Sequence, residues 1–127
     1  MAIILDTHAL SAFADGDTVL GSVIEQEREL AVPVIVLGEY LFGIKQSRHR
    51  LAYEKWLSEQ LRHFLLLPVR ADTARHYAAV MAELKAAGRP IPTNDLWIAA
   101  IALEHNGRLL TRDQHFRSVP GLRVVSW

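Results

Sequence analysis

Short apolar runs and longer amphipathic segments alternate along most of the chain. The short runs are rich in leucine and β-branched residues, and they predict buried strands at residues 3–5, 31–36, 65–69, 108–111 and 122–125. The segments between them carry apolar residues at helical spacing, and they predict helices over residues 9–13, 19–28, 38–46, 51–64, 72–85 and 93–107. Strands separated by helices indicate an α/β fold, with a parallel sheet and helices on both of its faces.

Three of the predicted helices have features that bear on packing. The 51–64 helix gathers its large apolar residues on one face, so we expect it to pack on the sheet. The 93–107 helix is apolar nearly all round and should be buried, with Trp97 in the core. Asp72 and Thr93 stand where N-caps are expected for the last two helices.

Length and composition favour one domain that spans residues 1–127. Half of the 127 residues are apolar and 22% are charged, which is ordinary for a folded protein. The chain has no cysteine, which excludes a disulfide scaffold, a zinc–thiolate site and a thiol nucleophile. No stretch has the character of a signal peptide or a membrane span, so we expect a cytoplasmic protein with no membrane contact.

The charges are balanced. Formal net charge is zero, so no global field attracts a polyanion, and any contact with nucleic acid must be local. Eleven of the 14 basic residues are arginine, whose planar guanidinium suits phosphate groups. This composition is only a weak indication of a phosphate-containing partner.

Four acidic residues stand at the ends of apolar runs. Asp6 follows Ile3–Leu5, Glu39 follows the run that ends at Leu37, Asp95 lies in the first turn of the 93–107 helix, and Asp113 follows Leu109–Leu110. In a parallel α/β sheet, ligands bind beyond the carboxyl ends of the strands, where the strand order reverses. We therefore expect the four carboxylates to meet at that edge, with Glu39 in the first turn of its helix.

Carboxylates gathered in this way need a compensating charge. Two of them about 4 Å apart repel by roughly 4 kcal/mol at an effective dielectric constant near 20. Protonation or a bound Mg²⁺ or Mn²⁺ offsets this repulsion, and a metal held by oxygen ligands favours hydrolysis of a phosphodiester. Each acid also has a structural interpretation: Asp6 and Asp113 as caps, and Glu39 and Asp95 as acids in the first turns of helices.

Polar neighbours of these acids are candidates for a supporting role. Thr7, Asn94 and Thr111 are placed to orient carboxylates or waters, and Arg112 is the best candidate to touch a phosphate. For His8 and His115 we favour a structural or substrate-contact role over metal ligation, because the carboxylates already supply ligands.

Four motifs together resemble the PIN-domain ribonucleases, in particular the VapC-type toxins of prokaryotic toxin–antitoxin pairs. The motifs cover essentially the whole chain: residues 6–11 (DTHALS), 36–39 (VLGE), 94–99 (NDLWIA) and 110–116 (LTRDQHF).

The resemblance implies a three-layer α/β/α sandwich with a central, mostly parallel sheet. It also implies Mg²⁺- or Mn²⁺-dependent endoribonuclease activity, homodimerisation and inhibition by a cognate VapB-type antitoxin. Asp6, Glu39 and Asp95 match the three core acids of the family, and Asp113 matches the more variable fourth. Many relatives carry Asn at the position of Asp113, or Asp directly before the Phe, where this chain has His115.

Three other functions fit parts of the pattern. An enzyme that transfers phosphoryl groups through an Asp nucleophile would usually have a second acid two residues after Asp6, where His8 stands. A receiver-type signalling domain needs a lysine after a late strand, and Lys45, Lys55 and Lys85 do not supply one. A PIN-like domain that only binds a partner would have no need of intact acids.

Overall fold

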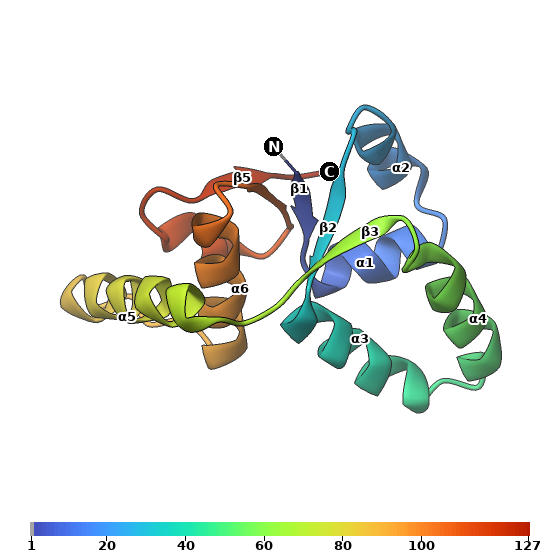
Figure 1. Cartoon of the computed structure of the whole chain (residues 1–127), viewed down its shortest axis with the longest axis horizontal. Coiled ribbons are helices and arrows are strands. Elements are labelled where there is room, and N and C mark those ends of the chain that lie inside the picture. The colour runs from blue at the N-terminus through green and yellow to red at the C-terminus, as the bar shows by residue number, and fades with distance from the viewer. Residues whose placement is uncertain (1) are drawn as a thin grey trace.

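The computed structural model describes residues 2–127 (Figure 1). Its strands are β1 (Ile3–Leu5), β2 (Leu30–Pro33), β3 (Phe64–Leu67), β4 (Arg108–Leu110) and β5 (Arg123–Val125). Its α-helices are α1 (Thr7–Ala14), α2 (Thr18–Glu25), α3 (Val34–Lys45), α4 (Arg50–Gln60), α5 (Ala71–Ala86) and α6 (Thr93–Glu104), and a 3₁₀ helix, η1, covers Gln114–Ser118. Within these residues, no helix combines the length and the hydrophobicity needed to cross a lipid bilayer.

All five strands pair in parallel, in the order β3-β2-β1-β4-β5. The chain starts in the middle of the sheet, adds β2 and β3 on one side of β1, and then adds β4 and β5 on the other. This reversal places α1 to α4 on one face of the sheet and α5 and α6 on the other (Figure 1). The predicted three-layer α/β/α architecture is confirmed.

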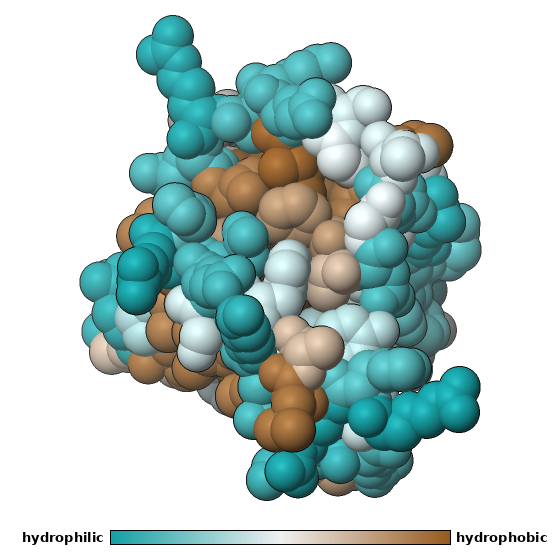
Figure 2. All heavy atoms as spheres, turned by 90° about the vertical axis from the view of Figure 1, so that its right-hand side faces the viewer, coloured by the Kyte–Doolittle hydropathy of each residue, from teal (hydrophilic) through white to brown (hydrophobic). Residues whose placement is uncertain are grey.

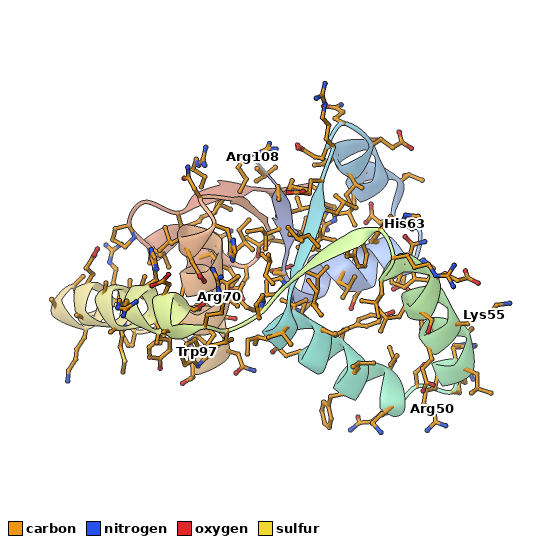
Figure 3. The ribbon with its side chains drawn as sticks, in the orientation of Figure 1. Arg50, Lys55, His63, Arg70, Trp97 and Arg108 are labelled. Carbon is orange, nitrogen blue, oxygen red and sulfur yellow. The ribbon has the colours of Figure 1, made fainter. Side chains whose placement is uncertain are left out.

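The core is built around the central strand. Ile3, Ile4 and Leu5 are completely buried, because β1 has a strand on either side and helices on both faces. Helix α6 is the most buried helix, with Leu96 and all residues from Ile98 to Ala102 inside, as its apolar sequence predicts. Trp97 is only partly buried and stacks on Tyr77 of α5, with ring centroids 4.1 Å apart (Figure 3).

The strand predicted at 31–36 is wrong beyond Pro33. Pro33 has extended backbone angles and is the N-cap of α3, so Val34 to Leu37 form the first turn of that helix. A short apolar run suits a buried helix as well as a strand, which is why its pattern misleads here. Glu39 consequently lies in the second turn of α3, and its predicted place in the first turn is also wrong.

Both predicted N-caps are wrong by a residue or two. Helix α5 begins at Ala71 with Arg70 as its N-cap, and the Arg70 backbone N–H donates to Thr73 Oγ1 at 3.0 Å. Asp72 instead lies in the first turn, paired with Arg75. Pro92 is the N-cap of α6, so Thr93 is already helical.

Helix α4 is shorter than predicted and packs elsewhere. It ends at Gln60, so Phe64 begins β3. Its main contacts are with α1 and α3, and its Trp56 packs on Phe13 and Tyr40 at centroid distances of 5.5 and 6.3 Å. Its apolar face therefore covers other helices instead of lying directly on the sheet.

Gly107 lies close against Ile4 in the sheet core. A Cβ added to Gly107 would lie 2.5 Å from Cδ1 and 3.1 Å from Cγ1 of the fully buried Ile4. We expect Gly107→Ala to lower the free energy of unfolding by about 1–3 kcal/mol, because a packed core cannot yield this space. Gly21→Ala, in α2 with nothing within 4 Å of the added atom, should raise it by roughly 0.5–1 kcal/mol. Urea unfolding of both variants checks this, and equal stabilities would contradict it.

Candidate metal centre

Asp6 is fixed by the pairing of β1 with β4. Leu5 is paired with Leu110, and the Asp6 N–H continues the ladder to the Leu110 carbonyl at 3.3 Å, so Asp6 and Thr111 are neighbours just beyond the strand ends. The Thr111 hydroxyl donates to Asp6 Oδ2, while the Ala9 N–H donates to Oδ1 at 2.8 Å. Asp6 is thus the N-cap of α1 and is only 3% exposed. Its structural interpretation is correct, and the same carboxylate also faces the cavity described below.

Glu39 is held from two other elements. The Thr7 hydroxyl of α1 donates to Glu39 Oε1 at 2.7 Å, and the Asn94 amide of α6 donates to Oε2 at 3.3 Å. Helix α3 starts directly at the end of β2, so its second turn reaches over the sheet edge toward both helices. The two hydrogen bonds fix both oxygens of this carboxylate.

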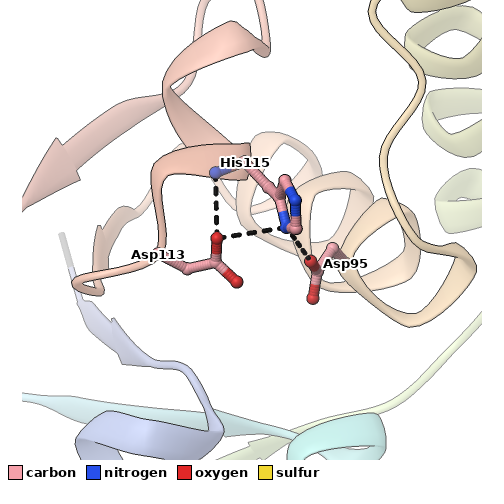
Figure 4. A group of neighbouring side chains, drawn as sticks. All are labelled: Asp95, Asp113 and His115. Atoms are coloured by element: carbon pink, nitrogen blue, oxygen red, sulfur yellow. Dashed lines mark hydrogen bonds and ion pairs between the residues drawn. The ribbon is translucent and has the colours of Figure 1, made fainter.

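Asp95, Asp113 and His115 form a cluster between α6 and η1 (Figure 4). The Nδ1 atom of His115 lies 3.2 Å from Asp95 Oδ2 and 3.1 Å from Asp113 Oδ1. Asp113 is the N-cap of η1 and accepts from the His115 N–H at 2.9 Å, so its structural interpretation is also correct. One ligand atom from each of the three residues lies within 4.8 Å of the others, a spacing that one metal ion could bridge.

All four acids line one small cavity of about 60 Å³. A threonine and a histidine of α1 also line it, and two apolar side chains form its floor. Its lining consists of Asp6, Thr7, His8, Glu39, Asp95, Ile98, Asp113 and Phe116. Within residues 2–127, no lysine or arginine lines it. The volume is sufficient for an ion with one or two waters, roughly 30 Å³ being the share of each water in the liquid.

The cavity disfavours charge on two of its acids. Burial is the largest cause that raises the pKa of Asp6, and the Thr111 and Ala9 hydrogen bonds only partly oppose it. Burial and the nearby Asp113 carboxylate raise the pKa of Asp95, against the lowering effect of His115. Both directions are those expected of carboxylates gathered without a cation.

The donor set fits a hard divalent cation. Four carboxylates supply oxygen ligands, and the hydroxyl and amide groups around them hold Asp6 and Glu39 in place. Mg²⁺ and Mn²⁺ prefer such oxygen ligands, usually from a few carboxylates together with waters and a substrate phosphate.

The remaining candidates divide into two groups. Thr7, Asn94 and Thr111 all donate hydrogen bonds to carboxylates that line the cavity. Arg112 lies elsewhere: its Nε donates to the Trp127 carbonyl at 2.8 Å, and its guanidinium stacks on the Trp127 ring at 4.4 Å. The structure therefore does not bring Arg112 to the cavity wall.

Three residues of the site have a larger part than the sequence suggested. His115 bridges two of the acids. The only sequence signal for this contact was its position two residues after Asp113. Ile98 and Phe116 form the apolar floor. Ile98 lies one helical turn after Asp95, and this spacing could have placed it beneath the carboxylate.

Comparisons with known proteins agree with this geometry. A model of the PIN domain matches residues 3–122. The chain is 31% identical over 100 residues to "Ribonuclease VapC4" of Mycobacterium tuberculosis, which covers 77% of each protein. The VapBC2 structure from Rickettsia felis, bound to a promoter DNA fragment, has a chain that superposes with a TM-score of 0.91 at 24% identity and covers 100% of this chain and 99% of its own. VapBC-1 from nontypeable Haemophilus influenzae gives 0.87 at 25% identity, covering 100% and 98%.

A pH titration of stability tests the burial of Asp6. Its pKa is raised from the ordinary value of 3.8, so the folded, metal-free protein binds this proton more tightly than the unfolded chain does. The stability that follows is complete below a pH of about 4 and is lost as pH rises through the raised folded pKa. We expect the free energy of unfolding of wild type, minus that of Asp6→Asn, to fall as pH rises in EDTA.

The matched control for this titration is Asp72→Asn, which removes an exposed carboxylate of α5. The difference in free energy of unfolding between wild type and Asp72→Asn should not fall as pH rises. Added Mg²⁺ or Mn²⁺ at 100 times its Kd should stabilise wild type by about 2.7 kcal/mol and Asp6→Asn by much less. If the metal stabilised Asp6→Asn as much as it stabilises wild type, Asp6 would not be a metal ligand.

Proposed function

Because the chain belongs to the PIN-domain family, as a VapC-type ribonuclease, we propose that Asp6, Glu39, Asp95 and Asp113 hold Mg²⁺ or Mn²⁺ and that the protein hydrolyses RNA phosphodiester bonds. The supporting observation is the convergence of these four acids, from four separate segments, on one cavity at the carboxyl ends of β1 and β4. The whole of residues 1–127 acts as one catalytic domain in this proposal.

The chain's own residues prepare the site before substrate arrives. Thr7 and Asn94 hold the two oxygens of Glu39, and Thr111 and the Ala9 N–H hold those of Asp6. The Asp113 N–H donates to Thr111 Oγ1 at 3.0 Å, which ties the fourth acid to the first. Ligands fixed in this way need no rearrangement in the transition state.

His115 joins two acids of the cluster. Its Nδ1 lies 3.2 Å from Asp95 Oδ2 and 3.1 Å from Asp113 Oδ1, so the ring bridges these two side chains. Its side chain is 51% exposed, so the ring can move aside toward solvent. A divalent cation bound among the acids supplies Lewis acidity toward the phosphate and lowers the pKa of an attacking water.

Cleavage of RNA tests the assignment of the acids. We expect Asp6→Asn and Asp95→Asn to lower kcat by more than about 100-fold, because even residues that only orient ligands are worth 10- to 100-fold. Glu39→Gln should fall in the same range, and Asp113→Asn should lose less. The measurement is the rate of cleavage of labelled single-stranded RNA with Mg²⁺ or Mn²⁺. Cleavage that survives EDTA, or that both Asp variants retain, refutes the mechanism.

The role of Thr7 has a matched control in the same helix position. Thr7 and Thr18 are the first residues of α1 and α2, but only Thr7 donates to a site carboxylate. We expect Thr7→Ala to lower kcat/KM by about 10- to 100-fold, with Thr18→Ala near wild type. Equal rates for the two variants would show that Glu39 does not need this hydrogen bond.

We further propose that a VapB-type antitoxin inhibits the enzyme, that it forms a homodimer and that it acts on RNA in the cytoplasm. Relatives of the same fold are found in VapBC complexes from Rickettsia felis and Haemophilus influenzae. The face that carries α4 exposes apolar side chains framed by hydrophilic ones (Figure 2). Leu37, Leu41, Leu57 and Leu61 line a groove of about 270 Å³ between α3 and α4, which suits an apolar partner segment.

Growth of bacteria that express the chain tests the toxin role. Wild type should arrest growth, Asp95→Asn should not, and co-expression of the small protein encoded beside it should restore growth. Arrest by Asp95→Asn at the same protein level would separate toxicity from catalysis. Sedimentation of the purified chain checks the dimer, which should have twice the 14.3 kDa mass of one chain.

A further inference from the structure

A second and larger hollow adjoins the acid cavity. It lies between α1, α3 and α4, has a volume of about 330 Å³, and shares Thr7, His8 and Glu39 with the acid cavity. We call it the α1–α3–α4 pocket. Its volume is at the lower end of the range of about 300–1,000 Å³ for small-molecule sites. A group bound here would lie directly beside the phosphate held at the carboxylates.

A buried hydroxyl without a partner belongs to this pocket. Tyr40 lines it and is only 4% exposed, and its hydroxyl has no hydrogen-bond partner among residues 2–127. Burial, with smaller contributions from Tyr53 and Asp15, raises the pKa of Tyr40 to about 12, so the group remains an O–H donor. Burying a hydroxyl unpaired is unfavourable, and an acceptor on a ligand would offset that cost.

The pocket also supplies an acceptor. Asp15, at the end of α1, accepts from the Tyr53 hydroxyl of α4 at 2.7 Å through Oδ1, and it retains further acceptor capacity. No lysine or arginine lines the pocket within the described residues, whereas Asp15 and Glu39 both do. The pocket therefore disfavours phosphate and suits an uncharged group with both hydrogen-bond donors and an acceptor.

We propose that the α1–α3–α4 pocket holds one unpaired guanine of the RNA substrate, beside the phosphate that is cut. Guanine has two adjacent donors, N1–H and the N2 amino group, for the Asp15 carboxylate, and its O6 accepts from the Tyr40 hydroxyl. Single-stranded RNA is the substrate class that this requires, because a paired base hides these edges. The inference rests on the proposed RNA cleavage.

The charges at the rim of the pocket agree with a guanine base that points inward. Ser47, at the outer end, is followed by exposed Arg48, His49 and Arg50. Arg50 lies at the start of α4 (Figure 3) and pairs with Glu54 on the surface. Basic groups outside a pocket that is lined by no lysine or arginine suit a nucleotide whose base points inward and whose phosphate stays at the surface.

Two readouts test the guanine site. Cleavage is measured on single-stranded RNA with one guanine, and on the same RNA with inosine, which lacks the N2 amino group. Binding is measured by fluorescence anisotropy with the Asp95→Asn protein, which cannot cut and leaves the pocket intact. We expect wild type to cut beside guanine, and inosine to lower kcat/KM and the binding constant by about tenfold, the effect of one lost hydrogen bond.

Three variants assign the contacts. Asp15→Asn should bring the guanine-to-inosine ratio close to one, while Tyr40→Phe should lower kcat/KM about tenfold and keep that ratio. Tyr40→Phe should not reduce stability, since it removes an unpaired buried hydroxyl. Asp17→Asn, in the same turn but outside the pocket, controls for the loss of one negative charge and should behave as wild type.

The outcomes separate this inference from the proposed function. RNA cleavage with no preference for guanine, or with Asp15→Asn and Tyr40→Phe indistinguishable from wild type, overturns the guanine site and leaves the nuclease intact. Absence of cleavage overturns the nuclease. The anisotropy measurement then still decides on the pocket, because equal binding of the guanine and inosine RNAs overturns it.

Discussion

Mutual repulsion of four carboxylates in a cavity of about 60 Å³ is the constraint on which the arrangement of this protein depends. Two carboxylates about 4 Å apart repel by roughly 4 kcal/mol at an effective dielectric constant near 20. The fold tolerates them because six of their eight oxygens have a polar partner: the Ala9 N–H and Thr111 for Asp6, Thr7 and Asn94 for Glu39, and His115 for one oxygen each of Asp95 and Asp113. These contacts allow the site to form without a metal, and a bound cation would offset the repulsion that remains.

The topology explains why these acids meet at one place. The strand order reverses between β1 and β4, so the segments after these two strands separate to opposite faces and leave a crevice between them. Asp6 and Asp113 follow those strands, and α3 and α6 bring Glu39 and Asp95 over the same edge. Two of the acids then serve twice, since Asp6 and Asp113 also cap the helical segments that follow them.

The sequence predicted the layers and the meeting of the four acids at one sheet edge, because both follow from local patterns: apolar runs mark strands, and acids at their ends mark the sheet edge. The strand prediction was wrong at Val34–Leu37, where a buried helix and a buried strand have the same apolar pattern. For the same reason Glu39 was predicted in the wrong turn of its helix. Long side chains were harder. Nothing in the local sequence shows that Arg112 stacks on Trp127, or that Tyr40 and Asp15 from different helices face one pocket. Such contacts depend on tertiary packing alone.

The hydrogen bond between Thr111 and Asp6 joins residues 105 positions apart. β1, at the start of the chain, has β4 as its partner on the side of the site, and Asp113 and His115 follow β4. During synthesis from the N-terminus, Asp6 and Glu39 emerge early but have no complete cavity until the segment around residue 115 has left the ribosome. A growing chain therefore cannot assemble this site, and its chemistry is delayed until the segment that carries Asp113 and His115 has been made.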